Sequence, residues 1–424
     1  MDNDLSFVRA LIDRAEDGLK DRFALIDRRE EAHTARVLGL FRKHAVALRH
    51  MSPTNGYGYD DQGRDTLEKI YADLFRTQAA IVRPQIASGT HALSLCLFGL
   101  LRPGDRLLSA TGMPYDTMEE VIGTAKCVPG SLKEMGVSFD VVDMTPDGQI
   151  DIEGVISALR PQTRVVMLQR SRGYAWRRSL LPEDMKGLFD RIKAVRPDVT
   201  LMVDNCYGGF VCDGEPTFYG ADVMAGSLIK NMGGGLAPTG GYIVGTDEAI
   251  ERIAARLTAP GIGREVGSYA ASYRPFYQGL FMAPHTVAQA MKVSLLTARV
   301  FEEMGLETTP PSTAERSDII QAIRMEEPER MIAYCQGIQA ASPVDSFAVP
   351  EPWDMPGYQD QVIMAAGTFV AGASIELSAD GPMRSPYVVY QQGGLTYAHG
   401  RLALQEALRH MIAKGCLPCH TSRN

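Results

Sequence analysis

The chain has 424 residues, of which 45% are hydrophobic and 22% are charged, a composition typical of a globular protein. Single cores rarely grow beyond about 250–300 residues, so the length predicts two domains. A formal net charge of −8 disfavours a nucleic-acid-binding protein.

The N-terminal stretch from Met1 to Leu5 is acidic and lacks the layout of a signal peptide. No apolar run approaches the roughly 20 residues that a membrane helix needs. The seven cysteines are odd in number and scattered, which favours reduced thiols over a disulfide framework. We therefore expect a soluble, cytoplasmic protein that binds neither nucleic acid nor membrane.

Residues 4–50 carry apolar side chains at helical spacing, which predicts one or two helices that form an arm or a lid on a partner. The turn-rich stretch 51–64 follows and holds Tyr57 and Tyr59. A long irregular segment inside a compact protein is more often functional than idle. A surface connector is the alternative.

A strand over 79–86 is predicted to lead into the turn Ser88-Gly89-Thr90 and an apolar helix over 92–101. Free N–H groups and the helix dipole converge at such a helix start, so the turn predicts an anion site. Ordinary capping of the helix is the alternative.

The middle of the chain alternates between strands and helices. Strands are predicted over 106–109, 137–142, 164–169, 199–204, 223–229 and 242–245. Helices are predicted over 66–74, 117–123, 152–159, 182–195 and 248–257. This alternation predicts an α/β fold with a mostly parallel sheet covered by helices on both faces. Ligands bind beyond the carboxyl ends of the strands of such sheets, so the residues that follow each strand are the candidate site.

Lys230 ends the apolar run that begins at Val223, and the glycines 233–235 come soon after it. We interpret the run as a buried strand that carries the lysine toward the interior. Burial lowers the pKa of an amine and makes it a usable nucleophile, and the glycines leave room for a flat ligand. The pattern favours a Schiff base with pyridoxal 5'-phosphate (PLP). A lysine that reaches solvent from a strand end is the alternative.

Asp204 follows the apolar run 199–203, and Tyr115 follows Met113-Pro114. A carboxylate in this position can hold a pyridinium nitrogen protonated, so that the cofactor accepts electron density from a carbanion. A turn former or helix cap is the alternative for Asp204. The ring of Tyr115 can lie over a flat cofactor.

The tail contains Cys416-Leu-Pro-Cys419-His420, which fits the pattern for c-type haem attachment. Attachment of this type belongs to exported proteins, and the chain shows no export signal, so we do not expect haem. Cys206 and Cys212 lack the paired spacing of a zinc site, and we predict no metal.

Longer stretches carry a family resemblance: Ser88-Gly-Thr-His-Ala, Met113-Pro-Tyr-Asp-Thr, Val203-Asp-Asn-Cys-Tyr-Gly, Ala225-Gly-Ser-Leu-Ile-Lys-Asn and Gln392-Gly-Gly-Leu-Thr-Tyr-Ala-His-Gly400. They resemble fold-type I PLP enzymes of the cystathionine and methionine γ-lyase group. More closely, they resemble bacterial proteins labelled aluminium-resistance or methionine γ-lyase-like. The resemblance implies a fold-type I PLP-dependent transferase-like fold with a helical arm and subunit-contact loop (1–60), a large PLP-binding domain (61–285) and a small C-terminal α+β domain (286–424).

The resemblance also implies a cofactor site. Lys230 would hold PLP as a Schiff base and later move protons. Asp204 would pair with the pyridine nitrogen, and Tyr115 would stack on the ring. The phosphate would lie in the turn at Ser88. There it would contact the backbone of Gly89 and Thr90 and the hydroxyl of Ser227.

The resemblance further implies a homodimer or homotetramer, in which Tyr57 or Tyr59 reaches the phosphate or the substrate of a neighbouring subunit. Arg384 is the candidate for a bidentate grip on the substrate carboxylate, and Arg172 is its rival. For either arginine, a surface role is the alternative. The sequence does not choose between a dimer and a tetramer.

The implied reaction is γ- or β-elimination after removal of the Cα proton by Lys230, with C–S cleavage of a methionine- or cystathionine-like substrate to a 2-oxo acid and ammonia. Tyr115, Tyr57 or Tyr59 would protonate the leaving group. One alternative is a PLP enzyme of specialised metabolism that eliminates or substitutes halide or acyloxy. Another is a non-catalytic stress or metal-resistance protein that retains the fold. The sequence does not identify the amino acid.

Three positions beside the implied site depart from the resemblance. Ile229 stands where the γ-lyases usually have Thr, so one phosphate contact is missing. Gly209 and Met232 stand where we expect Glu and Pro in the closer group. These changes mark either a different substrate or drift.

Overall fold

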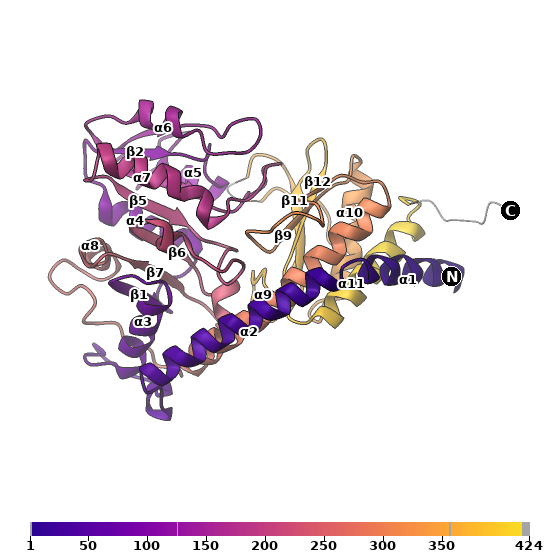
Figure 1. The fold of residues 1–424 in the computed structure, drawn as a ribbon, viewed down its shortest axis with the longest axis horizontal. Coiled ribbons are helices and arrows are strands. Elements are labelled where there is room, and N and C mark those ends of the chain that lie inside the picture. Colours follow the sequence, from indigo (N-terminus) through magenta and orange to yellow (C-terminus); the bar gives the residue numbers. More distant parts are fainter. Residues whose placement is uncertain (1, 125, 356–357, 418–424) are drawn as a thin grey trace. The chain divides into compact units, whose positions relative to one another are not determined.

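The computed structural model describes residues 2–124, 126–355 and 358–417. The chain divides into two compact units (Figure 1). Unit 1 contains Met1–Ala32, Tyr174–Arg178 and Ala283–Asn424, and unit 2 contains His33–Gly173 and Ser179–Met282. Each unit has its own sheet and is described by itself.

Unit 2 is built on a seven-stranded sheet with the order β1-β7-β6-β5-β4-β2-β3. The strands are β1 (Ala79–Arg83), β2 (Arg106–Ser109), β3 (Ser138–Val141), β4 (Thr163–Gln169), β5 (Thr200–Asp204), β6 (Val223–Ser227) and β7 (Gly241–Gly245). Strand β7 runs antiparallel to its neighbours β1 and β6, whereas the remaining pairs are parallel. The predicted mostly parallel sheet is confirmed.

Helices cover both faces of this sheet, as predicted (Figure 1). They are α3 (Gln62–Leu74), α4 (Gly89–Leu100), α5 (Asp116–Ile122), α6 (Ile152–Ala158), α7 (Lys186–Val195) and α8 (Asp247–Leu257). One face buries Ala225 and Ile243 with side chains of α4 and α8. On the other face, Phe75, which follows α3, stacks on Tyr242 with ring centroids 5.5 Å apart. Burial on both faces explains why the strands are almost continuously apolar.

Strand β6 is shorter than predicted, because it ends at Ser227 rather than Ile229. The N–H of Leu228 still donates to the carbonyl of Gly240, but the N–H of Ile229 turns back to the Ser227 hydroxyl. A short 3₁₀ helix, Asn231–Gly233, follows at once. Lys230 therefore lies in a turn beyond the strand, which frees its side chain from the pleat of the sheet.

Unit 1 contains the antiparallel sheet β10-β11-β12-β9-β8 and several helices. Its strands are β8 (Thr308–Thr309), β9 (Ile320–Arg324), β10 (Val362–Ala365), β11 (Ser378–Pro382) and β12 (Val388–Gln392). Its helices are α1 (Asp2–Asp17), α10 (Pro328–Ala340) and α11 (Tyr397–Ala413), with parts of α2 (Lys20–Lys43) and α9 (Arg274–Glu303). The predicted smaller C-terminal α+β part and the N-terminal helices are confirmed.

None of the helices in the described ranges is long and apolar enough to cross a membrane. Of the haem-like motif in the tail, Cys416 is partly exposed, and Cys419 and His420 lie outside the described residues.

Candidate active site

The first turn of α4 adjoins the ends of two central strands. A Cβ atom on Gly89 would lie 3.2 Å from the sulfur of Cys206 and 3.4 Å from the Cβ of Ser227. The residues that follow β5 and β6 therefore converge on the start of α4. Because a helix start offers N–H groups without intrahelical partners, this point can receive an anion.

The hydroxyls around this helix start take part in local hydrogen bonds. Ser88 Oγ accepts from the N–H of His91 at 3.0 Å, which is the capping bond expected of an N-cap serine. Thr90 shares a 3.0 Å hydrogen bond with Thr117. Ser227 Oγ accepts from the N–H of Ile229 at 3.3 Å. Accepting a bond leaves the proton of each serine hydroxyl available to a bound anion.

Asp204 is the last residue of β5 and is only 6% exposed. Its Oδ1 accepts from the N–H of Cys206 at 2.9 Å, so the turn-forming role is also present. Burial raises the pKa of Asp204, against the lowering effects of the Cys206 N–H and of Lys230. A buried carboxylate is stabilised by a cation, and a protonated ring nitrogen would supply one.

Lys230 is partly buried, and its electrostatic surroundings differ from the sequence prediction. Burial by itself lowers the pKa of the amine, but Cys206, Tyr207 and Asp204 together raise it above the ordinary value. The predicted fall in the pKa of Lys230 is therefore wrong for this structure. These neighbours therefore favour the charged form of the amine.

Tyr115 is the N-cap residue of α5 and is held at the end of β4. Its N–H donates to Oε1 of Gln169 at 2.7 Å. A Cβ on Gly173 would lie 3.3 Å from Tyr115 Cδ2, so the ring lies along the chain that follows β4. The N–H of Gln169 donates to Oγ1 of Thr111 at 3.0 Å, which links the loops after β2 and β4.

The two arginine candidates lie in different units. Arg172 is 2% exposed and belongs to unit 2, as Lys230 does. Arg384 belongs to unit 1, where its half-exposed side chain pairs with Asp360 at 3.1 Å. In the single chain, Arg384 is therefore a surface residue, which was the alternative to a role in substrate binding. A surface ion pair of this kind is weak, so its partner can be exchanged.

Tyr57 and Tyr59 lie on the surface of the chain, 72% and 62% exposed. Their ring centroids are 5.6 Å apart. The carbonyl of Tyr57 accepts from the N–H of Gly267 at 2.9 Å, which fixes the loop that carries both rings. Two exposed aromatic rings on a fixed loop are accessible to another molecule.

Sequence reasoning missed a buried polar network beneath the loop after β5. Arg170 Nη1 donates to Asn205 Oδ1 at 2.7 Å and lies 3.0 Å from Glu215 Oε2. Asn205 Nδ2 donates to the same carboxylate oxygen and to the hydroxyl of Tyr242. Since these partners are far apart in sequence, no local pattern could have identified them.

Sequence reasoning also missed Tyr207 and Asn231, which surround Lys230. The Lys230 Nζ lies 3.7 Å from the centroid of the Tyr207 ring. Asn231 Nδ2 donates to the carbonyls of Tyr207 and Gly209, each at 2.9 Å. The signal in the sequence was their nearness to two predicted site residues, because Tyr207 is three positions after Asp204 and Asn231 directly follows Lys230.

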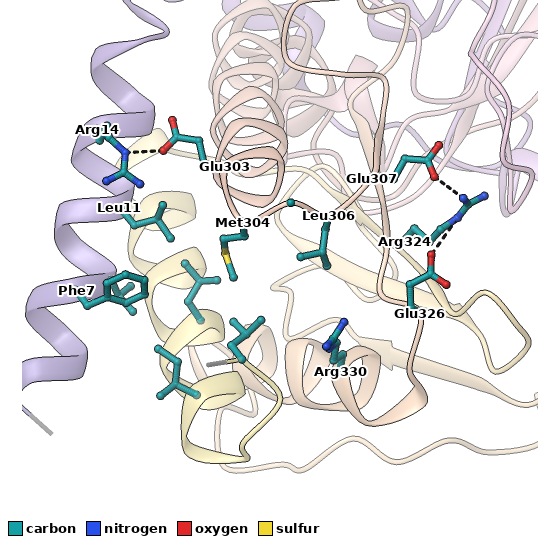
Figure 2. A pocket seen from close by; sticks show the side chains of 15 residues that line it. Phe7, Leu11, Arg14, Glu303, Met304, Leu306, Glu307, Arg324, Glu326 and Arg330 are labelled. Carbon is teal, nitrogen blue, oxygen red and sulfur yellow. Dashed lines mark hydrogen bonds and ion pairs between the residues drawn. The ribbon is translucent and has the colours of Figure 1, made fainter. Parts of the chain in front are cut away.

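A separate cavity of about 510 Å³ lies within unit 1. Figure 2 shows apolar side chains such as Leu11 on one side and charged side chains around them. Arg14 pairs with Glu303 at 2.7 Å, and Arg324 pairs with Glu307. These charges satisfy one another, and none of the described residues that line the cavity belongs to the predicted site.

The site in unit 2 fits PLP. The start of α4 lies close to Cys206 and Ser227, where a side chain at Gly89 would be in tight contact, which suits a phosphate held by backbone N–H groups. The buried Asp204 suits a cationic ring nitrogen, and Lys230 Nζ is the amine that can hold an aldehyde. The departure at Ile229 removes a hydroxyl but none of these groups.

Comparison with known proteins agrees with this geometry. The sequence profile of a family described as methionine gamma-lyase matches residues 8–412. The uncharacterized protein YnbB of Bacillus subtilis (strain 168) is 52% identical over 390 residues, which cover 92% of this chain and 93% of that protein.

Two solved structures are similar over nearly the whole chain. A protein from Listeria monocytogenes (str. 4b F2365) is 48% identical with a TM-score of 0.92, covering 95% of this chain and 99% of that one. Its name gives cystathionine beta-lyase involved in aluminum resistance as a provisional assignment. A protein from Clostridium novyi NT, named as a carbon-sulfur lyase involved in aluminum resistance, is 46% identical with a TM-score of 0.92, covering 95% of each chain.

Proposed function

Because the chain belongs to the methionine gamma-lyase family, we propose that it is a PLP-dependent carbon–sulfur lyase that acts on an amino acid. The observation that carries the proposal is the convergence of three groups in unit 2. A buried carboxylate (Asp204), an amine (Lys230) and a helix start with a closely packed glycine (Gly89) meet at the ends of neighbouring strands. Each group matches a different part of the cofactor.

Bound PLP supplies an electron sink for the negative charge that develops at the substrate Cα. Gly89, Thr90, Ser88 and Ser227 would hold the phosphate, and Asp204 would hold the ring nitrogen protonated. Lys230 would hold the cofactor covalently until an amino acid replaces it.

Lys230 is then the base that takes the proton from Cα. The surroundings of Lys230 raise the pKa of its amine, which favours uptake of the Cα proton by the neutral amine. Tyr115 would donate a proton to the departing sulfur, and general acid catalysis of this kind typically contributes about 10²–10⁴-fold. The products are a thiol, a 2-oxo acid and ammonia.

We assign the substrate carboxylate to Arg384 rather than Arg172. The guanidinium of Arg384 is accessible and already holds a carboxylate, that of Asp360, whereas Arg172 is buried. A planar guanidinium binds a carboxylate through two parallel hydrogen bonds, and a substrate can take the place of Asp360.

We further propose that the enzyme is a homodimer or homotetramer in which Tyr57 or Tyr59 completes the site of a neighbouring subunit. Their exposure on a fixed loop supports this arrangement. Mixing a Lys230→Ala protein with a Tyr57→Ala/Tyr59→Ala protein tests it. Hybrid oligomers should regain part of the activity, and mixtures that stay inactive despite subunit exchange would contradict shared sites.

The proposed function is tested with a substrate panel. Purified protein supplied with PLP is incubated with methionine, homocysteine, cystathionine, cysteine and amino acids that carry a γ-halide or γ-acyloxy group. We expect 2-oxo acid, ammonia and thiol from the sulfur compounds, and a visible cofactor band that Lys230→Ala abolishes. The matched control is Lys186→Ala, which removes an exposed lysine that pairs with Asp190.

The panel also separates the remaining functions. Release of 2-oxo acid from the halide or acyloxy compounds alone would favour an enzyme of specialised metabolism. A protein that binds no PLP and releases no product would overturn the proposed function and leave a binding protein.

A further inference from the structure

The face of the Tyr207 ring lies against the amine of Lys230. The Nζ atom is 3.7 Å from the ring centroid. An ammonium this close to an aromatic face is attracted by the negative charge of that face, and the attraction grows where water is excluded. Because Tyr207 follows β5 and Lys230 follows the neighbouring strand β6, the contact joins two loops of the site.

The backbone that presents this ring is in an unusual conformation. Tyr207 has a φ of +68°, and Phe210 in the same turn has a φ of +62°. Bulky side chains rarely adopt the left-handed region. Such residues persist where the surrounding structure holds them, and they cluster at functional sites.

Asn231 is the group that holds the turn. Its side chain is buried, and its Nδ2 donates to the carbonyls of Tyr207 and Gly209, both at 2.9 Å. The residue directly after the lysine therefore fixes the turn that carries the ring. Lys230 supplies the amine, and its neighbour Asn231 supplies the clamp.

Tyr207 differs from the other groups that face the lysine. The carboxylate of Asp204 also favours the charged amine, while burial opposes it. The Tyr207 ring is in van der Waals contact with the amine, so it attracts the amine toward one defined surface. A lysine with four rotatable bonds needs such a surface if it is to return to one position.

We propose that Tyr207 is the positioning residue of Lys230, with its ring face as the resting place of the free amine and Asn231 as the clamp that fixes the ring. The proposal rests on the proposed function, because that function assigns the proton transfers at Cα to Lys230. In those transfers the amine of Lys230 would be free, and contact with the Tyr207 ring would restrict the positions that it can take.

The test compares Tyr207→Asn with Tyr207→Phe. Asparagine tolerates the left-handed backbone but lacks the ring, whereas phenylalanine keeps the ring and loses the hydroxyl. Acetylation of Lys230 in cofactor-free full-length protein is followed by peptide mass spectrometry from pH 7 to 11, relative to the exposed Lys186. Tyr387→Asn is the control for this measurement, because Tyr387 also has a left-handed φ, +56°, but lies in unit 1.

In Tyr207→Asn, we expect the curve of acetylation rate against pH to move to lower pH, with a rate at pH 9 about five- to thirtyfold higher. Tyr207→Phe should stay within about threefold of the unaltered protein, and Tyr387→Asn should not change the curve. Greater access alone would raise the rate without moving the pH at which the rate levels off, which separates exposure from charge stabilisation.

The loaded enzyme provides a second measurement. Tyr207→Asn should lower kcat about tenfold, leave KM within about twofold and enlarge the isotope effect of a substrate deuterated at Cα. If Tyr207→Asn does not fold, Tyr207→Gly replaces it, since glycine also accepts the backbone.

An unchanged acetylation curve in a folded ring-deleted variant would overturn the positioning role. That outcome is distinct from failure of the proposed function, because acetylation is measured without cofactor or substrate. Conversely, a protein that releases no product would overturn the lyase function while the acetylation curves still decide the Tyr207 contact.

Discussion

A Cβ atom on Gly209 would lie 2.5 Å from the sulfur of Met232, a separation that real Cβ atoms essentially never show. These are the two positions at which the sequence departs from the closer resembling group, where Glu and Pro are expected. The structure brings the two departures into contact. The loss of a side chain at one position makes room for the longer side chain at the other, beside Lys230.

Gly209→Ala should lower the free energy of unfolding by about 1–3 kcal/mol through overpacking. Met232→Ala alone should cost about 2–5 kcal/mol because it leaves a cavity. The double variant should cost about 1–3 kcal/mol less than the sum, measured by chemical denaturation. Gly39→Ala is the control, since its Cβ would meet nothing within 4 Å. Additive costs would show that the contact does not couple the two positions.

Asp204→Asn should retain the fold, because the amide oxygen can still accept from the Cys206 N–H. The neutral amide cannot stabilise a cationic ring nitrogen, so we expect kcat to fall at least about 10²-fold, in the range seen when one electrostatic contact is removed. Asp198→Asn alters an exposed carboxylate just before the same strand and serves as the control. Equal activity of both variants would remove Asp204 from the cofactor site.

Cys206 should resist alkylation at pH 8. Burial and the nearby Asp204 raise the pKa of the thiol from 9.0 to about 12, so little thiolate is present. Iodoacetamide should modify the exposed Cys127 about a hundredfold faster, as measured by peptide mass spectrometry. In Asp204→Asn, the Cys206 rate should rise because one cause of the shift is gone. Rapid modification of Cys206 at pH 8 would contradict this assignment.

The same shift predicts an alkaline limit to stability. A folded-state pKa above the unfolded value means that the neutral thiol stabilises the fold fully below pH 9. This contribution is lost as the pH rises from 9 toward 12. Cys206→Ser should therefore show a shallower decline of the melting temperature over that interval than the unaltered protein does.

Glu215→Ala should destabilise unit 2 by about 3–5 kcal/mol, because it leaves the buried guanidinium of Arg170 without its carboxylate. The exposed pair of Lys186 and Asp190 provides the comparison, and Asp190→Ala should cost no more than about 1 kcal/mol. Denaturation monitored by circular dichroism measures both. Similar costs for the two variants would show that the buried network contributes no more than a surface pair.

Arg384→Lys should raise KM for the amino-acid substrate about tenfold or more with a smaller change in kcat, because a lysine cannot form the bidentate contact. Arg172→Lys is the matched comparison, because it tests the alternative in which Arg172 binds the substrate carboxylate. Substrate titrations of the two variants decide between them. A larger rise in KM for Arg172→Lys would reverse our assignment.

The sequence by itself determined the fold class, because strand burial on both faces appears directly as continuous apolar runs between helical stretches. It also located most loops of the candidate site. In parallel strands of a sheet, the carboxyl ends lie on one edge, so Ser88, Tyr115, Asp204 and Lys230 could be grouped without coordinates. Chain order and strand polarity are enough for that inference.

Only the tertiary structure decided how those loops act on one another. The pKa of Lys230 rises instead of falling, because Cys206 and Tyr207 surround the amine and local sequence records burial but not neighbours. The left-handed turn at Tyr207, the clamp from Asn231 and the contact between Gly209 and Met232 depend on residues about 20 positions apart or more. Such contacts are set by the packing of neighbouring strands, which no local pattern encodes.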